Sequence, residues 1–202
     1  MQKEVLWMGF ALLLAGSVPV DAQNDSGDRK WFIGSTLLLL GNFDQTNNPE
    51  YLQLNAGYRI TPKDVVQVRF KRSIYAWPLG IPFGPDFDGP GLNYPGHARI
   101  LAPQLGYQRF WWKGAYTAVY VLNAFEKYMD ENKMKIGNGF TLYTDFYVGY
   151  QFKFFNDRFF FEPAIGCSYW PLRTDVPASF KAAEKGWPNY FVQPGLDFGF
   201  KF

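Results

Sequence analysis

Apolar and polar side chains alternate along most of this chain. The pattern is clearest at the C-terminus, where apolar residues occupy the even positions from Val192 to Phe202 and polar or very small residues occupy the odd positions from Gln193 to Lys201. Successive side chains of a β-strand point to opposite faces of a sheet, so this period of two predicts strands with one apolar and one polar face. Eight such blocks can be delimited, at residues 31–41, 51–60, 65–75, 98–112, 115–128, 140–155, 158–170 and 190–202.

The connections between these blocks alternate in length. In an up-and-down arrangement of eight strands, all the long connections then fall at one rim and all the short turns at the other. That asymmetry is typical of outer-membrane barrels, whereas a soluble sandwich would bury its apolar face and would rarely sort its loops so cleanly. We therefore expect an all-β fold, an eight-stranded antiparallel up-and-down transmembrane β-barrel, with ten strands as the alternative count if a loop contains another hairpin. The long connections are residues 41–50, 76–97, 129–139 and 171–189, and the tight turns are residues 61–64, 113–114 and 156–157.

The first 22 residues have the features of a secretory signal peptide. Lys3 provides a basic start, residues 5–15 form a short apolar segment, and small side chains at Val20 and Ala22 suit a signal peptidase. The apolar segment is short for crossing a bilayer. We expect cleavage after Ala22, which leaves residues 23–202 as one barrel domain.

Composition excludes several classes of protein. The chain has 202 residues, of which 48% are hydrophobic and 20% aromatic, with a formal net charge of +2. A disordered chain would lack this apolar content, and a helical membrane bundle would need longer apolar runs. The near balance of charge gives no broad basic surface, so we expect no nucleic-acid partner. The single cysteine, Cys167, cannot form an intrachain disulfide, and alternation places it on the apolar face.

The chain ends on Phe202 with aromatic rings at alternate positions, Phe198 and Phe200 preceding it. This ending resembles the C-terminal assembly signal of bacterial outer-membrane barrels, and the eight-block layout is similar to small barrels of the OmpA and OmpX type. The resemblance implies recognition by the barrel-assembly machinery, a location in the bacterial outer membrane, and contact with outer-membrane lipid and lipopolysaccharide. A monomer is expected.

The polar face is expected to line the interior of the barrel. An eight-stranded barrel is only wide enough for side chains to fill it, so inward charges should pair with one another and plug the lumen. A narrow pore for small solutes is the alternative interpretation. The expected lumen charge network comprises Arg59, Arg69, Lys71, Asp145, Lys153, Glu162, Asp197 and Lys201.

Aromatic residues are expected to gather in two belts where the barrel meets the lipid headgroups. The belt at the short-turn rim would contain Trp31, Trp111, Trp112, Phe154, Phe155 and Phe202, and the belt at the long-loop rim would contain Tyr75, Trp77, Tyr128, Trp170 and Tyr190.

Catalysis has little support in the sequence. His97 is the only histidine, Ser73 lies on a preceding strand, and Asp86 and Asp88 lie in the loop between them. A catalytic set needs these groups within hydrogen-bond reach, and a loop of this size offers such a combination by chance. We expect no catalytic residues, no metal and no cofactor, and a structural or surface-recognition role through long outer loops. An enzyme that hydrolyses or transfers acyl chains of lipid A is the alternative. Basic residues of the last loop, namely Arg173, Lys181 and Lys185, are expected to contact lipopolysaccharide phosphates.

Overall fold

The computed structural model describes residues 29–44, 48–76 and 94–202. The expected signal peptide, Trp77, Asp86 and Asp88 lie outside these residues. The described part is all-β, with a 3-10 helix η1 (Leu37–Phe43) and a short α-helix α2 (Ala178–Ala183). The strands are β1 (Trp31–Thr36), β2 (Leu52–Arg59), β3 (Asp64–Tyr75), β4 (His97–Trp112), β5 (Ala115–Met129), β6 (Lys135–Tyr150), β7 (Phe152–Phe154), β8 (Phe159–Thr174) and β9 (Tyr190–Lys201).

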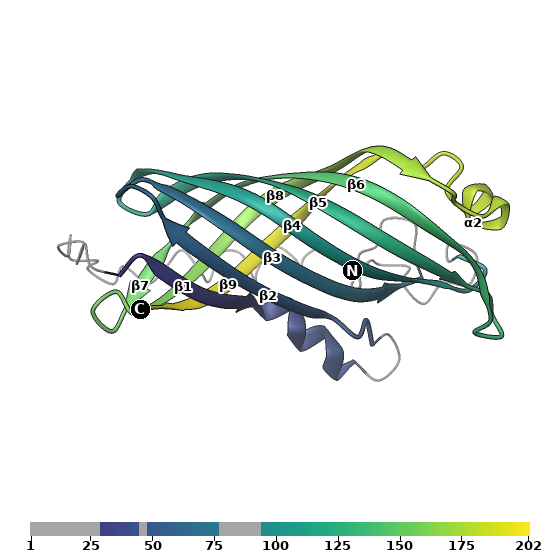
Figure 1. Ribbon diagram of the computed structural model, residues 1–202, viewed down its shortest axis with the longest axis horizontal. Helices are drawn as coiled ribbons and strands as arrows, with labels where there is room; N and C mark the ends of the chain where they lie inside the picture. The colour runs from purple at the N-terminus through teal and green to yellow at the C-terminus, as the bar shows by residue number, and fades with distance from the viewer. Residues whose placement is uncertain (1–28, 45–47, 77–93) are drawn as a thin grey trace, which may run out of the picture.

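These nine strands form one antiparallel sheet that closes into a ring (Figure 1). Consecutive strands from β1 to β6 pair with one another, β8 pairs with β9, and β1 pairs with β9. The expected block 140–155 is divided at Gln151 into β6 and β7, and both pair with β8. The backbone N–H of Gln151 donates to the carbonyl oxygen of Gly114 in the neighbouring turn. This division accounts for nine strands where eight were expected; the described residues contain no tenth strand.

The first strand is shorter than the sequence predicts. Alternation predicts a strand over 31–41, but β1 ends at Thr36 and the chain continues as η1. The four consecutive leucines from Leu37 to Leu40 break the period of two, and the Thr36 hydroxyl caps the new helix by accepting a hydrogen bond from the Leu38 N–H. At seven residues, η1 is long for a 3-10 helix.

Other connections are also tighter than expected. Strand β5 ends at Met129 and β6 begins at Lys135. Their connection is therefore residues 130–134, where residues 129–139 were expected. Strand β8 continues to Thr174, and the helical α2 follows in the last connection. Figure 1 shows α2 and the β5–β6 connection at one end of the ring and the C-terminus at the other.

The two faces of the sheet have opposite polarity. Outward-facing apolar side chains are exposed, for example Leu54 at 56%, Val68 at 57% and Leu105 at 63%, while the inward-facing Gln108 and Glu162 are almost fully buried. Other exposed apolar side chains on several strands are Ile33, Phe70, Leu101, Val121, Phe146, Val148, Ile165, Val192 and Phe200. Among the described residues, no helix is long and apolar enough to span a membrane.

Inward-facing glycines make room for aromatic rings inside the ring of strands. A Cβ on Gly106 would lie 2.0 Å from the Tyr120 ring on β5, and a Cβ on Gly57 would lie 2.1 Å from the Phe32 ring on β1. Each glycine is directly opposite or beside the strand position that carries the ring. Small residues therefore alternate with large ones to fill a narrow interior.

The aromatic residues expected at the short-turn rim are exposed, but those expected at the other rim behave differently. Trp112 and Phe155, expected at the short-turn rim, are 68% and 81% exposed. Tyr190, expected at the long-loop rim, is exposed as well. Tyr75 and Tyr128 instead point inward and are buried, because they share the parity of the inward residues of β3 and β5. Cys167 is a free, partly exposed thiol on the outward face of β8.

Candidate functional site

The interior of the ring is the candidate site, and at the short-turn end it holds an ion-paired cluster. The Lys201 ammonium, on a residue 4% exposed, donates to Asp157 Oδ1 at 2.6 Å and to Gln151 Oε1 at 3.0 Å. Lys153 Nζ lies 3.3 Å from the other oxygen of Asp157. Asp157 was missed in the sequence because it lies in a turn, where a solvated carboxylate is the ordinary expectation.

Glu162 is fixed by neutral donors. Its Oε1 accepts hydrogen bonds from Gln108 Nε2 at 3.0 Å and from Gln151 Nε2 at 2.6 Å. Gln108 in turn accepts a hydrogen bond from Gln67 Nε2 at 2.6 Å. The expectation that this carboxylate pairs with an inward Arg or Lys is therefore wrong; glutamines on neighbouring strands reach it first.

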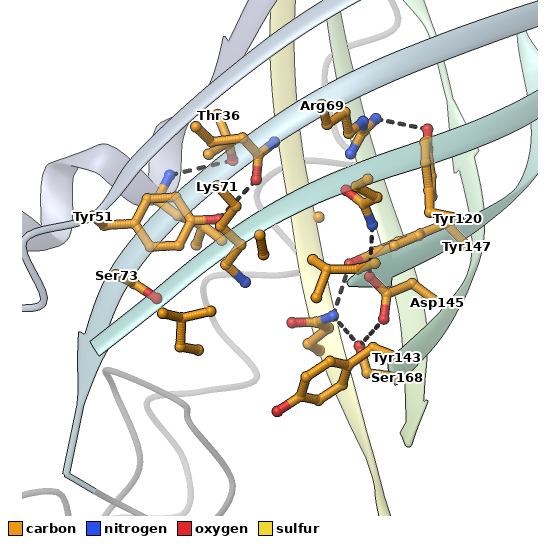
Figure 2. Close-up of a pocket in the computed structure, with 18 of the residues that line it drawn as sticks. Thr36, Tyr51, Arg69, Lys71, Ser73, Tyr120, Tyr143, Asp145, Tyr147 and Ser168 are labelled. Carbon is orange, nitrogen blue, oxygen red and sulfur yellow. Dashed lines mark hydrogen bonds between the residues drawn. The ribbon is translucent and has the colours of Figure 1, made fainter. Parts of the chain in front are cut away.

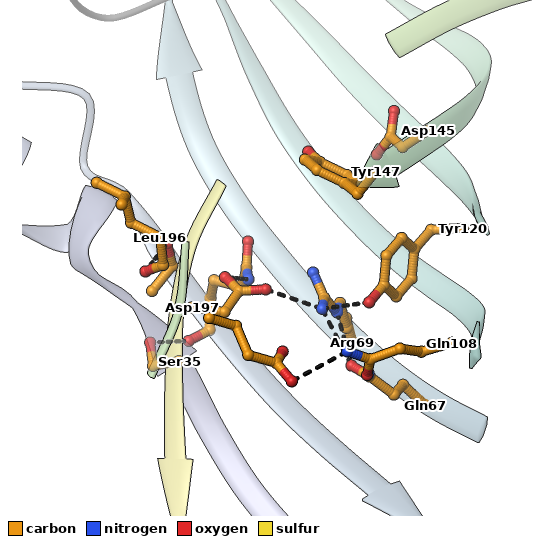
Figure 3. A network of polar contacts seen from close by, with 12 residues as sticks. Ser35, Gln67, Arg69, Gln108, Tyr120, Asp145, Tyr147, Leu196 and Asp197 are labelled. Carbon is orange, nitrogen blue, oxygen red and sulfur yellow. Dashed lines mark hydrogen bonds and ion pairs between the residues drawn. The ribbon is translucent and has the colours of Figure 1, made fainter. Parts of the chain in front are cut away.

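Arg69 and Asp197 form the ion pair at the centre of the interior (Figure 3). Their side chains are 7% and 15% exposed, and Arg69 Nη2 lies 2.8 Å from Asp197 Oδ2. The guanidinium also donates to Gln67 Oε1 and to the Tyr120 hydroxyl, and it lies 3.9 Å from the centre of the Tyr120 ring. Most of its donors are thus occupied by protein groups.

Asp145 also departs from the expected pairing. Its oxygens accept hydrogen bonds from Ser168 Oγ at 2.6 Å and Gln104 Nε2 at 3.0 Å. Ser168 in turn accepts from Gln193 Nε2 at 2.6 Å. A carboxylate held by two neutral donors leaves the nearby basic side chains to find other partners.

Two of the expected basic residues stand apart from these clusters. Arg59 donates to the carbonyl oxygen of Pro62 at 2.7 Å, in the turn at the short-turn rim. Lys71 is inward-facing on β3, and its ammonium lies 5.3 Å from the centre of the Tyr51 ring. Neither residue joins the carboxylates named in the expected network.

A further polar cluster, not expected from the sequence, lies toward the long-loop end. Glu126 is 1% exposed and accepts hydrogen bonds from the hydroxyls of Tyr75 and Tyr128. Arg173 lies 3.7 Å from Glu126 and 2.5 Å from Glu184. Glu126 shares the parity of the inward Tyr120, so alternation contained a signal for it. Arg173 is engaged inside, which contradicts the expectation that it is free for lipopolysaccharide phosphates.

A bulge explains why Arg173 points inward. Along β8 the inward residues are even-numbered through Ser168, but the register with β6 shifts by one residue between the Thr144–Tyr169 and Leu142–Leu172 pairs. One extra residue in a strand reverses the parity of everything after it. The sequence contains no signal for the shift beyond Pro171, which has no backbone N–H to donate to a neighbouring strand.

Helix α2 packs over this cluster. Phe180 is fully buried, with its ring centre 4.4 Å from that of Tyr94 and 4.9 Å from that of Tyr128. The Tyr94 hydroxyl donates to Glu184, which follows the helix, and burial raises the pKa of this phenol well above its usual range. The last connection is therefore folded against the interior.

Between the Arg69–Asp197 pair and the cluster of Glu126 and Arg173 lies a cavity of about 300 Å³ (Figure 2). Its wall combines polar side chains with aliphatic and aromatic ones from β3, β4, β5, β6, β8 and β9. Residues Lys71, Ser73, Asp145, Tyr143, Ile100, Leu122, Trp170 and Phe191 are part of its lining.

The residues considered for catalysis do not assemble into a catalytic set. Ser73 lies on the cavity wall, whereas His97 begins β4, its Nε2 is buried without a hydrogen-bond partner, and no hydrogen bond joins the two. The described residues also contain no group of three or more His, Cys, Asp or Glu side chains that could hold a metal ion.

Comparison with family models, with curated protein sequences and with solved structures finds no match to this chain.

Proposed function

We propose that this chain is a transmembrane β-barrel of the bacterial outer membrane with a structural or surface-recognition role. Residues 1–22 act as a cleaved signal peptide, and residues 23–202 insert as a monomer with the help of the barrel-assembly machinery, which reads the ending at Phe198, Phe200 and Phe202. The barrel is not an enzyme in this proposal. Its outer loops carry the specificity.

The inverted polarity of the sheet carries the proposal. Leu54, Val68 and Leu105 would each expose more than half of their surface to water if the ring were soluble, while Arg69 and Glu162 would be buried at the same time. Water favours the opposite arrangement, and hydrocarbon favours this one. Closure of the ring also supports it, because a sheet with free edges cannot satisfy its backbone groups in lipid.

The interior supports a barrel that does not conduct freely. Successive clusters around Lys201, Glu162 and Arg69 link side chains from facing strands, and α2 packs over the long-loop end. A narrow pore is the alternative, and it would be recognised by stepwise single-channel conductance in planar bilayers. A lipid A acyl hydrolase or transferase would be recognised by turnover of labelled lipid A.

Two of the three basic residues expected to contact lipopolysaccharide remain candidates for that contact. Arg173 is engaged with Glu126 and Glu184, but Lys181 and Lys185 in the same connection are exposed. Their ammonium groups can donate charge-assisted hydrogen bonds to lipopolysaccharide phosphates. Replacing both lysines by glutamine should weaken the retention of lipopolysaccharide during purification; unchanged retention would contradict this part of the proposal.

Membrane insertion is tested with one charge on the outward face. Leu105→Asp places a carboxylate in the middle of β4 on a side chain that is 63% exposed. A charge on the lipid face of a barrel is costly, so the variant should fold poorly into vesicles and lose the heat-dependent shift in electrophoretic mobility of the folded protein. Leu105→Val is the matched control. Normal insertion of Leu105→Asp, or a wild-type chain that stays soluble without detergent and does not float with vesicles, would refute the proposal.

A further inference from the structure

The cavity in the interior contains a basic group that the protein leaves without a hydrogen-bond acceptor. Lys71 lines the cavity from β3; among the described residues its ammonium makes no hydrogen bond or ion pair, lies 5.3 Å from the centre of the Tyr51 ring, and interacts with the Asp145 and Asp197 carboxylates only over a longer distance. An ammonium has three donors, and an aromatic face satisfies none of them as an oxygen would. Every other inward-facing basic side chain of the described strands has an oxygen partner: Arg59 has Pro62, Arg69 has Asp197, Lys153 and Lys201 have Asp157, and Arg173 has Glu126.

The carboxylates on the same cavity wall are held by other groups. Asp145 accepts from Ser168 and Gln104, and Asp197 is paired with Arg69 (Figure 2, Figure 3). These fixed hydrogen bonds explain why neither carboxylate turns to Lys71. The ammonium is thus left facing a cavity in which an oxygen acceptor from outside the chain can reach it.

Part of the wall is suited to an apolar body. Ile100, Leu122, Trp170 and Phe191 contribute aliphatic and aromatic surface. The volume of about 300 Å³ is at the lower end of the range for pockets that bind small molecules. A cavity whose wall is partly apolar and holds one ammonium without a hydrogen-bond acceptor fits a small molecule with an anionic head and an apolar tail.

The cavity also reaches a seam in the ring. Because β1 ends at Thr36, the part of β9 before Asp197 has no strand beside it on the β1 side. Here η1 takes the place of a strand: Thr36 Oγ donates to the Leu196 carbonyl oxygen, and the Asn42 amide bonds both backbone groups of Tyr51. At this seam, side chains rather than a backbone ladder bound the cavity.

An apolar groove of about 590 Å³ flanks the end of β1 on the outward face, close to the seam. Its lining includes Ile33, Leu54, Val68, Phe70, Phe198 and Phe200. Apolar surface is therefore present on both sides of the wall near the seam, as a molecule with an apolar tail would require.

We propose that the interior cavity binds a small carboxylate with an apolar tail, and that Lys71 receives the carboxylate. This goes beyond the proposed recognition by outer loops, and it assigns a ligand class to an interior that would otherwise only fill the barrel. The tail would rest against Ile100, Leu122 and Trp170.

The test uses octanoate labelled with ¹³C at the carboxylate and the full mature chain folded in lipid nanodiscs. Carbon NMR of the carboxylate distinguishes the protein-bound ligand from ligand dissolved in lipid, for which empty nanodiscs provide the reference. Wild-type protein should give a saturable bound resonance. Octanol, which has the same tail without the charge, should compete at least tenfold more weakly, because a hydrogen bond to a charged group contributes about 1.5–3 kcal/mol.

Lys71→Met keeps the length of the side chain and removes its charge. This variant should bind octanoate at least tenfold more weakly while folding normally, since Lys71 has no oxygen partner to lose. Lys127→Met removes an exposed charge on β5 and should bind as wild type does. If Lys71→Met does not fold, Leu122→Phe offers a second route, because its ring would occupy part of the cavity and should weaken binding.

The proposal would be overturned by octanoate binding that persists in Lys71→Met, by equal affinity for octanoate and octanol, or by a wild-type signal no different from that of empty nanodiscs. These outcomes are distinguishable from failure of the proposed membrane location, because the flotation test described above is made on protein without added octanoate.

Discussion

The buried pair of Arg69 and Asp197 allows a quantitative test of how the interior is held together. Asp197→Asn preserves the shape of the side chain and removes the charge that faces Arg69 Nη2 at 2.8 Å. The guanidinium side chain is 7% exposed, so water cannot replace the lost partner fully. Leaving a buried charge without its partner costs about 3–5 kcal/mol, and the hydrogen bonds that Arg69 keeps with Gln67 and Tyr120 favour the lower end of that range. We expect about 3 kcal/mol.

Glu162→Gln is the comparison within the same interior. Glu162 is as well buried but accepts hydrogen bonds only from the neutral side chains of Gln108 and Gln151. Its replacement leaves no unpaired cation, and the amide oxygen can still accept from both donors, because both bind Oε1, although the bonds lose the charge of their acceptor. The expected loss is therefore smaller, about 1–2 kcal/mol.

The assay is reversible unfolding by urea in phospholipid vesicles, followed by tryptophan fluorescence. The double variant Arg69→Met with Asp197→Asn completes a cycle, and we expect it to be at least about 1 kcal/mol more stable than the sum of the single variants implies, since it removes both members of the pair. The reasoning would be refuted if Asp197→Asn cost less than Glu162→Gln, or if the single effects simply added.

Three further predictions concern the seam, the helix at the long-loop end and pH. Asn42→Ala removes two hydrogen bonds to Tyr51 and should lower the free energy of unfolding by about 1–2 kcal/mol, with Asn42→Asp keeping only the acceptor and falling between. Phe180→Ala empties a fully buried site and should make residues 175–189 sensitive to protease without preventing insertion; resistance like that of wild type would contradict the packing of α2. Burial, with Arg99 and Lys133 nearby, lowers the pKa of His97, the first residue of β4, so folding favours its neutral form. That stability is present above the ordinary pKa of about 6.5 and is lost as pH falls toward the folded-state pKa, and His97→Asn should abolish this part of the pH dependence in urea unfolding.

Alternation determined which side chains share a face wherever the strands are regular. It placed Arg69, Glu162, Asp197 and Lys201 in the interior and Val192 on the outside, because successive residues of a strand must point in opposite directions. It also predicted the all-β, antiparallel arrangement. Pairing partners were beyond its reach, because neighbouring strands bring together residues distant in sequence.

Only the tertiary structure decided where the alternation stops and which interior groups meet. The leucines after Thr36 form η1 because a seam beside β9 is available to receive them, and the bulge near Pro171 turns Arg173 inward toward Glu126. The sequences of residues 31–41 and 158–170 show which side chains are present, but they do not show how these segments pair with the neighbouring strands. The sequence by itself determined a ring of strands with two faces of opposite polarity. The distances across that ring decided that Asp145 and Glu162 accept hydrogen bonds from amides and a hydroxyl, while Lys71 faces a cavity. The reason is that hydrogen bonds depend on atomic positions that only closure of the sheet establishes.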